Sequence, residues 1–282
     1  MPESSIALTR NTEMRRRSLL AAAASAACLL SMGVAHAADQ DTLAAIREAK
    51  TIRVALEFGR PPWGFKDDKL KMSGSDMEAA ELLASDLGVK LEIVEVTGPN
   101  RIPFLQTKKA DVVLSTFSIT PERLKVIDFS APYASAVQIV GAPKSLALKS
   151  EGDLKGKRVG VTRATTGDVE LTKKAKDLGV EVVRFDDEST NMTALASGQV
   201  DIVIQEPATL TAVAARNPQR QLEPKFIFTQ FPVGIGLRKN DPALKSYLDQ
   251  WVKTRMADGK LNAIYRKYHG TDLPAEIVKP GS

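Results

Sequence analysis

The sequence predicts an α/β protein of two lobes, each a mostly parallel sheet flanked by helices. Short apolar runs alternate with helix-length segments in the order strand, helix, strand, helix, strand. After a break, the same order begins again. Two such units in tandem favour two sheets with a cleft between them over one longer, continuous sheet.

Each series contains three strands and two helices. In the first, strands are expected at residues 52–56, 91–96 and 111–114, and helices at residues 76–87 and 101–107. In the second, strands are expected at residues 158–161, 181–184 and 201–205, and helices at residues 167–178 and 190–197. Glycines 88, 179 and 198 end three of these helices, since glycine readily adopts the left-handed conformation found at helix ends. Two further helices, at residues 242–257 and 260–268, close the chain.

The first 37 residues have the pattern of an export signal. A basic cluster at residues 15–17 precedes an apolar stretch at residues 19–34, and residues 35–37 (Ala-His-Ala) form a small-residue cleavage site. The apolar stretch is shorter than the roughly 20 residues that a membrane span needs. We therefore predict a cleavable signal peptide over residues 1–37. The twin-arginine and general export routes, and Met1 and Met14 as starts, stay open.

Composition argues against several kinds of site. Cys28 is the only cysteine and lies in the predicted signal, so the exported chain would lack disulfides, thiolate nucleophiles and cysteine metal sites. Only His269 would remain as a histidine, which disfavours zinc chemistry and a Ser/His triad. Removing residues 1–37 deletes four basic and two acidic residues, so the formal charge falls from +5 to +3. This small excess, without a long basic run, does not favour nucleic acid as a partner.

Hydroxyl side chains follow the third strand, and an arginine comes shortly after them. Residues 115–123 read Ser-Thr-Phe-Ser-Ile-Thr-Pro-Glu-Arg. Ligands of open α/β sheets bind beyond the carboxyl ends of the strands. Thr120 can cap a short helix that begins at Pro121, so backbone N–H groups and the guanidinium of Arg123 can face one anion. We expect Arg123 to bind a carboxylate through its rigid fork; a surface salt bridge with an acid such as Glu122 is the alternative.

This segment resembles the signature of the periplasmic solute-binding proteins of polar amino-acid ABC transporters, family 3 of the bacterial extracellular solute-binding proteins. The resemblance covers nearly the whole chain after Ala38. Further matches are Arg53-Val54, Pro62-Trp63-Gly64-Phe65, Leu105-Gln106 with Ala110-Asp111, Leu154-Lys155-Gly156-Lys157 and Gly198-Gln199-Val200-Asp201. The resemblance implies the type II periplasmic-binding-protein fold.

In that fold the closing helices return to the first lobe. The expected organisation is the signal peptide at residues 1–37, lobe I at 41–136, lobe II at 137–232 and the completion of lobe I at 233–282. The chain would cross between the two lobes near residues 135–137 and again near residues 231–233. These crossings form a two-strand hinge that can close on a ligand.

The resemblance also assigns binding roles on both sides of the cleft. Thr116 and Ser118 occupy family positions that bind the ammonium and carboxylate of the ligand. Thr165 and Thr166 fall where relatives present N–H groups and a hydroxyl to the carboxylate from the second lobe, with a plain helix cap as the alternative. Glu206 stands where the family usually has an aspartate for the α-ammonium. Its alternative is a helix N-terminal acid favoured by the helix dipole.

Specificity is expected to come from residues near the first and second strands. Arg101 lies in Asn-Arg-Ile-Pro, which resembles a motif of acidic amino-acid binders whose arginine meets the side-chain carboxylate. Arg60 lies where many relatives have an aromatic side chain. Two arginines favour glutamate or aspartate, whereas Glu57 sits where other members receive a basic side chain. Phe58 and Trp63 are ligand contacts or, as aromatics beside a turn, packing residues of the lobe.

We therefore predict a periplasmic binding protein, not an enzyme, that closes on a polar, acidic amino acid and delivers it to an inner-membrane permease. It is expected to be a monomer without metal or cofactor. The alternative is a periplasmic enzyme on the same fold that resembles cyclohexadienyl or arogenate dehydratase, with Glu57 or Glu206 as a general acid.

Overall fold

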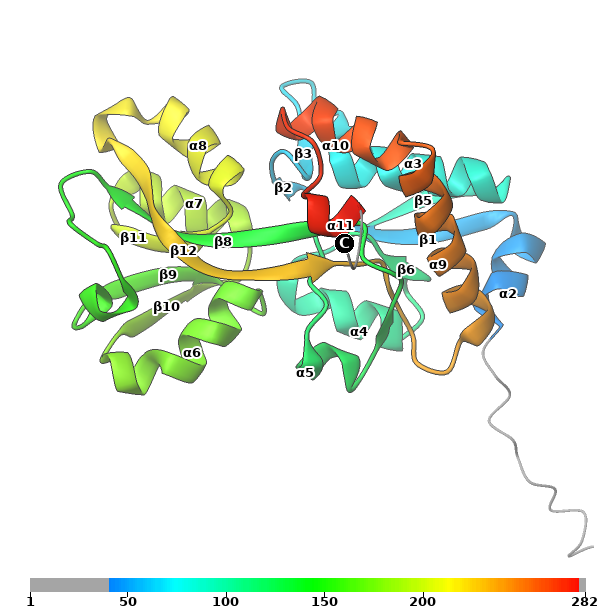
Figure 1. Ribbon diagram of the computed structural model, residues 1–282, viewed down its shortest axis with the longest axis horizontal. Coiled ribbons are helices and arrows are strands. Elements are labelled where there is room, and N and C mark those ends of the chain that lie inside the picture. Colours follow the sequence, from blue (N-terminus) through cyan, green and yellow to red (C-terminus); the bar gives the residue numbers. More distant parts are fainter. Residues whose placement is uncertain (1–40, 279–282) are drawn as a thin grey trace, which may run out of the picture. The chain divides into compact units, whose positions relative to one another are not determined.

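The structure of the protein, a computed structural model, describes residues 41–278. The predicted signal peptide over residues 1–37, with Cys28, lies outside the described residues. Within residues 41–278, no helix is both long and apolar enough to cross a membrane. The described chain has the predicted two-lobe α/β fold, with one five-stranded sheet in each lobe (Figure 1).

The first lobe is built on a sheet with the strand order β5-β1-β6-β13-β7. Its strands are β1 (Thr51–Leu56), β5 (Lys90–Glu95), β6 (Val112–Val113), β7 (Asp128–Phe129) and β13 (Gly236–Leu237). Strand β1 is parallel to β5 and β6, whereas β13 is antiparallel to β6 and β7. The helices beside it are α2 (Thr42–Ala49), α3 (Ser75–Leu87), α4 (Arg101–Gln106), α5 (Pro121–Leu124), α9 (Pro242–Ala257) and α10 (Lys260–His269). The elements predicted for this part are confirmed, although β6 is shorter than expected.

Apolar side chains of the closing helices are buried together with those of the first sheet. Leu248 and Trp251 of α9 lie in the same cluster as Ile52 and Val54 of β1. Leu261 of α10 belongs to it as well. The closing helices therefore contribute to the core of the first lobe, and α11 (Ala275–Val278) ends the described chain.

The second lobe has the strand order β10-β9-β11-β8-β12. Its strands are β8 (Ala134–Pro143), β9 (Arg158–Thr162), β10 (Glu181–Phe185), β11 (Ile202–Gln205) and β12 (Leu222–Val233). Its helices are α6 (Thr166–Leu178), α7 (Glu188–Ser197) and α8 (Pro207–Arg216). The first three strands of the order are parallel, and β8 and β12 add antiparallel pairs. The predicted strands and helices of the second series are again found, and α8 is an addition.

Strands β8 and β12 connect the lobes. They pair from Ala134 with Val233 to Pro143 with Leu222, and Figure 1 shows both running from one lobe into the other. At the first-lobe end, the N–H of Tyr133 donates to the carbonyl of Val233 at 2.9 Å. The two-strand hinge is thus present, while the residues at which the lobes divide stay a prediction.

A small antiparallel sheet, not expected from the sequence, follows β1. It consists of β2 (Gly59–Arg60), β3 (Gly64–Lys66) and β4 (Met72–Ser73) in the order β2-β3-β4. Trp63 lies in the turn between β2 and β3, is buried in the first core, and packs edge-on against Tyr265 and His269. Trp63 therefore packs in the core of the lobe, and its side chain also donates a hydrogen bond to the carboxylate of Glu206.

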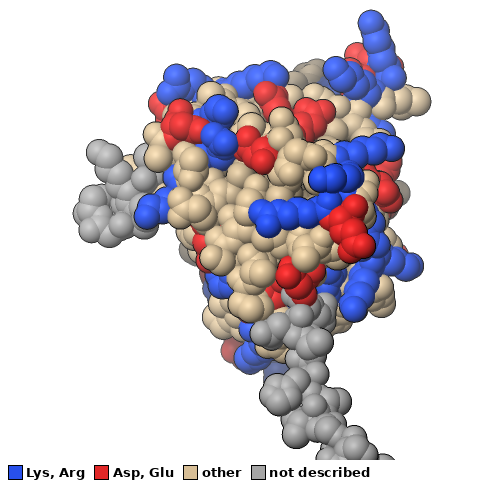
Figure 2. Space-filling model, turned by 90° about the vertical axis from the view of Figure 1, so that its right-hand side faces the viewer, with Lys and Arg blue, Asp and Glu red and all other residues tan. Residues whose placement is uncertain are grey.

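Charges on the surface are mixed. Figure 2 shows basic and acidic side chains interspersed on one face of the molecule, with uncharged residues between them. Ion pairs such as Lys245 with Asp249 (2.8 Å) and Arg255 with Asp86 (2.7 Å) join opposite charges on the surface. Such exposed pairs contribute little to stability, so the two apolar cores carry most of it.

Candidate functional site

Two buried arginines of the first lobe lie against the second lobe. Arg101 opens α4 and donates from Nη1 to the carbonyl of Ser115 at 3.3 Å and from Nη2 to the carbonyl of Ala164 at 3.3 Å. Arg123, in α5, donates to the carbonyls of Ser118 at 2.7 Å and of Ala164 at 3.0 Å. Both guanidinium groups therefore meet at one carbonyl beyond β9 of the second lobe.

The ring of Phe117 lies beside both arginines. The guanidinium carbon of Arg101 is 5.0 Å from the ring centroid, and that of Arg123 is 4.6 Å away. Among residues 41–278, no carboxylate forms an ion pair with either arginine; both guanidinium groups donate to backbone carbonyls. The alternative of a surface salt bridge for Arg123 is wrong, because the side chain is buried and Glu122 instead pairs with Lys173.

Burial acts on the charges of these two arginines. It lowers the pKa of Arg101 to about 10, partly opposed by the carboxylate of Glu57. The pKa of Arg123 is lowered by burial first and then by the positive charges of Arg101 and Arg60. Two desolvated cations side by side without a carboxylate favour the binding of an anion between the lobes.

A second group of buried charges adjoins the arginines. Arg60 of β2 is surrounded by three glutamates that come from both lobes. Its Nη2 lies 3.2 Å from Oε2 of Glu188 and 3.8 Å from Oε2 of Glu57, and its Nη1 lies 3.1 Å from Oε1 of Glu206. All four side chains are at most 5% exposed. Three carboxylates on one guanidinium leave this part of the site with an excess of negative charge.

The three glutamates differ in their hydrogen bonds. Glu188 also accepts from the hydroxyl of Thr162 at 3.1 Å and from the amide of Gln205. Glu206 accepts from the amide of Gln138 at 3.4 Å. Neither carboxylate oxygen of Glu57 has a hydrogen-bond donor in the described structure.

Burial raises the pKa of two of these carboxyls. It raises the pKa of Glu188 to about 7, against the opposing charge of Arg60. Burial likewise raises the pKa of Glu206, with Arg60 again opposing. The pKa of Arg60 is lowered by burial but raised by more through the three carboxylates, so the net shift is upward. The guanidinium is therefore held charged, while the carboxyls of Glu188 and Glu206 take up protons more readily than exposed carboxyls do.

Thr116 and Ser118 lie at the predicted place, but their groups are already engaged. The N–H and hydroxyl of Thr116 donate to one oxygen of Asp76 at 2.7 and 3.0 Å. The other oxygen of Asp76 accepts from the hydroxyl of Tyr133 at 2.9 Å. Thr116 has a φ of 45°, a left-handed conformation uncommon for a β-branched residue. Asp76 therefore holds the strand-end loop in place, and the carbonyl of Ser118 accepts from Arg123.

Thr165 acts as a helix cap. Its hydroxyl accepts from the N–H of Asp168 at 3.2 Å and donates to the carbonyl of Thr162 at 2.6 Å, so the capping alternative is realised. Thr166, the first residue of α6, is buried beside it. Glu206 is the N-cap residue of α8, but its side chain makes no capping hydrogen bond. The structure thus brings Arg60, Glu57 and Glu206 together and leaves Thr165 in a structural contact.

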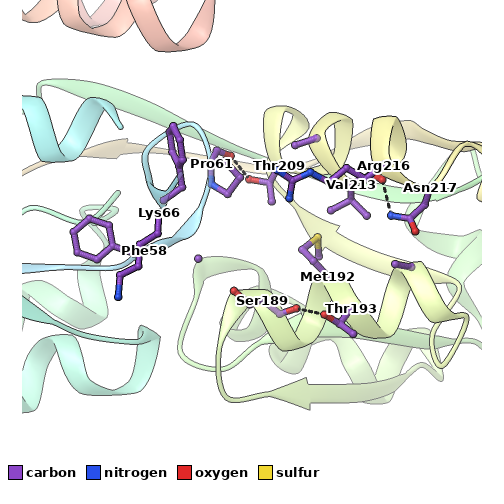
Figure 3. Close-up of a pocket in the computed structure, with 14 residues that line it drawn as sticks. Phe58, Pro61, Lys66, Ser189, Met192, Thr193, Thr209, Val213, Arg216 and Asn217 are labelled. Atoms are coloured by element: carbon purple, nitrogen blue, oxygen red, sulfur yellow. Dashed lines mark hydrogen bonds between the residues drawn. The ribbon is translucent and has the colours of Figure 1, made fainter. Parts of the chain in front are cut away.

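Phe58 lines a surface pocket of about 360 Å³. Figure 3 shows this pocket between the β2–β3 turn of the first lobe and α7 and α8 of the second. The hydroxyl of Thr209 donates to the carbonyl of Pro61 across it at 2.9 Å. Phe58 also packs against the first core, and its expected ligand contact stays a prediction.

Sequence reasoning missed two residues of the site. Glu188 was expected to precede a helix at residues 190–197, and an acid at a helix start is ordinary; no local signal marks it. Asp76 was expected only as the start of a helix. Its burial could not be foreseen, because Thr116 and Tyr133 are distant in sequence. Among the described residues, no cluster of three or more His, Cys, Asp or Glu side chains could hold a metal ion.

Comparisons with known proteins all find similarity to solute-binding proteins. Residues 52–271 match the family model for bacterial extracellular solute-binding proteins, family 3. The L-cystine-binding protein TcyJ of Escherichia coli K12 is 32% identical over 250 residues, which cover 88% of this chain and 93% of that protein.

Two solved structures are similar as well. An ancestral arginine-binding protein bound to arginine is 38% identical with a TM-score of 0.74, covering 78% of this chain and 98% of that one. The ancestral amino acid-binding protein AncCDT-1, a precursor of cyclohexadienyl dehydratase, is 33% identical with a TM-score of 0.71, covering 80% of this chain and 99% of that one.

Proposed function

The chain belongs to family 3 of the bacterial extracellular solute-binding proteins, and we propose that it binds a polar amino acid in the periplasm and delivers it to an ABC transporter permease. One observation carries the proposal: the buried groups between the lobes are divided by charge. Arg101 and Arg123 have no carboxylate partner, whereas three glutamates share Arg60. A zwitterion fits such a divided site, with its carboxylate at the arginines and its ammonium at the glutamates.

In this proposal Arg123 binds the α-carboxylate and Glu206 the α-ammonium. In the same proposal, backbone groups near Ser118 and Thr166 contact the ligand beside Arg123; the hydrogen bond from Arg123 to the carbonyl of Ser118 supports this for Ser118. Arg101 receives a side-chain carboxylate, which makes glutamate or aspartate the preferred ligand. The preference for an acidic ligand is supported by the two buried guanidinium groups. With a neutral amino acid, Arg101 and Arg123 would share the single negative charge of its α-carboxylate.

A thermal-shift screen of the protein against the twenty amino acids and small dicarboxylates tests the proposal. A ligand bound only by the folded state raises Tm through mass action. We expect the largest rise with L-glutamate or L-aspartate and none with succinate, which lacks the ammonium. No rise with any amino acid would contradict the proposal, and a larger rise with L-glutamine than with L-glutamate would contradict the acidic preference.

The partners follow from the same proposal. A monomer that closes on its ligand presents both lobes to the permease, and the ligand-bound form is the one to be recognised. Sedimentation with and without the ligand tests the monomer. Ligand-stimulated ATP hydrolysis by the reconstituted transporter tests delivery.

A second candidate is a periplasmic dehydratase. It is favoured by the raised pKa of two buried carboxyls, because Glu188, with a pKa of about 7, can hold a proton near neutral pH for a leaving group, and burial also raises the pKa of Glu206. The likeness to AncCDT-1 fits the same idea. Incubation with prephenate and with arogenate, followed by the absorbance of aromatic product, decides. Product formation that is lost in Glu206→Gln supports the enzyme, and no product above the rate without protein rejects it.

A further inference from the structure

We propose that Arg60 is an internal counter-ion that occupies the cation subsite of the binding site and thereby excludes amino acids with cationic side chains. This inference rests on the proposed function, because it concerns which amino acids the same site accepts. It assigns a specificity-determining role to a residue that would otherwise be taken as a contact for a ligand carboxylate.

The surroundings of Arg60 are those of a cation-binding pocket. Three carboxylates, from Glu57, Glu188 and Glu206, lie within 3.1 to 3.8 Å of its terminal nitrogens. Buried carboxylates in such numbers recognise a guanidinium or ammonium group through charge-assisted hydrogen bonds. Here that group comes from the protein itself.

The fit of Arg60 is incomplete. Its Nε is buried without an acceptor, and both oxygens of Glu57 are buried without a donor. A buried carboxylate without a hydrogen-bond donor is costly even 3.8 Å from a guanidinium, and a ligand cation with free N–H groups would satisfy it. The pocket therefore has the chemistry to hold a cation, and Arg60 fills that place imperfectly.

The backbone keeps Arg60 in this position. Its neighbour Gly59 lies against α7, where an added Cβ would come within 2.8 Å of Oγ of Ser189 and 3.4 Å of Cβ of Glu188. The absence of a side chain lets β2 approach the start of α7. The guanidinium thus reaches Glu188, whose carboxylate is itself fixed by Thr162 and Gln205.

A cationic side chain, added to the ligand's own α-ammonium, cannot share the pocket with Arg60 without cost. Two desolvated positive charges at one site repel each other, and the same effect lowers the pKa of Arg123 and Arg101 beside Arg60. A lysine or arginine ligand would have to displace Arg60. An acidic or neutral amino acid brings only its α-ammonium, for which three carboxylates on one guanidinium leave negative charge, so the site selects for it.

The test removes the internal cation and supplies an external one. In Arg60→Met we expect L-arginine and methylguanidinium, each at about 10 mM, to raise Tm by at least about 3 °C, while the wild-type protein shows no rise. The matched control is Arg158→Met, which removes an arginine from a surface pair with Glu181, and it should behave as the wild type does. Circular dichroism verifies that each variant is folded.

Several results would overturn the proposal. One is a folded Arg60→Met that responds to neither cation; another is a wild-type protein that binds L-arginine as tightly as L-glutamate. If Arg60→Met does not fold, the double variant Glu57→Gln/Arg60→Met lowers the uncompensated charge and should give the same gain. A folded double variant without that gain also overturns the proposal.

Failure of the proposed function would look different. If no amino acid stabilises the wild type but methylguanidinium still stabilises Arg60→Met, the cation subsite stands and amino-acid binding falls. If L-glutamate stabilises the wild type but neither L-arginine nor methylguanidinium stabilises Arg60→Met, amino-acid binding stands and the cation subsite falls.

Discussion

Substitution of Gly98 by alanine should weaken ligand binding without weakening the ligand-free protein. Gly98 begins the short helix η1 (Gly98–Asn100) of the first lobe. A Cβ built on it would lie 2.4 Å from the carbonyl oxygen of Arg163 in the second lobe, a separation that real Cβ atoms essentially never show. The φ of Gly98 is not in the left-handed region, so the clash with the facing lobe, and not backbone strain, is the effect of the change.

The size of the effect follows from the clash. Backbone cannot rotate away as a side chain can, so the lobes must stay farther apart, and overpacking of this kind costs about 1–3 kcal/mol, or about 5- to 150-fold in Kd. Calorimetric titration with the amino acid found by thermal shift measures the loss. Ligand-free Tm should stay near that of the wild type, because open lobes do not bring Arg163 against Gly98.

Gly152 provides the matched control for this substitution. A Cβ there would meet only Oγ of Ser150, at 3.7 Å, so Gly152→Ala should bind as the wild type does. An unchanged Kd for Gly98→Ala would refute the reasoning, as would a fall in ligand-free Tm as large as the loss of affinity.

Three further predictions concern the charged groups. Arg123→Ala should lose roughly 2 kcal/mol of affinity, about 30-fold in Kd, because a desolvated ligand carboxylate is left unpaired; calorimetry showing an unchanged Kd would contradict it. Arg101→Ala should raise the Kd of L-glutamate more than that of L-glutamine, and equal losses for both would remove its role in specificity. Burial raises the pKa of Asp76 to about 6 from 3.8, so the folded state binds this proton more tightly than the unfolded chain. Its contribution to stability is full below about pH 3.8 and is lost as the pH rises through about 6; Asp76→Asn should flatten this part of the Tm profile, and parallel profiles would contradict it.

The alternation of apolar runs and helix signals was sufficient to predict most elements of both sheets. The pattern fails for β12, because Pro224, Lys225 and Pro232 interrupt its apolar residues. β12 lies at the edge of the sheet, next to β8, where proline is tolerated. A pattern of local residues cannot reveal that position, so only the end of this hinge strand at residues 231–233 was expected, from the resemblance.

Those parts of the candidate site that lie within one short segment of the sequence could be predicted. Thr120 does cap the helix that begins at Pro121, which presents Arg123 as the local pattern suggested. Arg60 was expected beside a ligand carboxylate, yet it lies among three glutamates. Glu188 and Glu206 are more than a hundred residues from Arg60 in sequence, and only the contact between the lobes brings them to it.

The most direct test of the account is a crystal structure of the protein with the amino acid that gives the largest thermal shift. The account predicts a ligand carboxylate within about 3 Å of the terminal nitrogens of Arg123, and the ligand ammonium on the side of Glu206. A ligand bound with its carboxylate away from both Arg123 and Arg101 would contradict it.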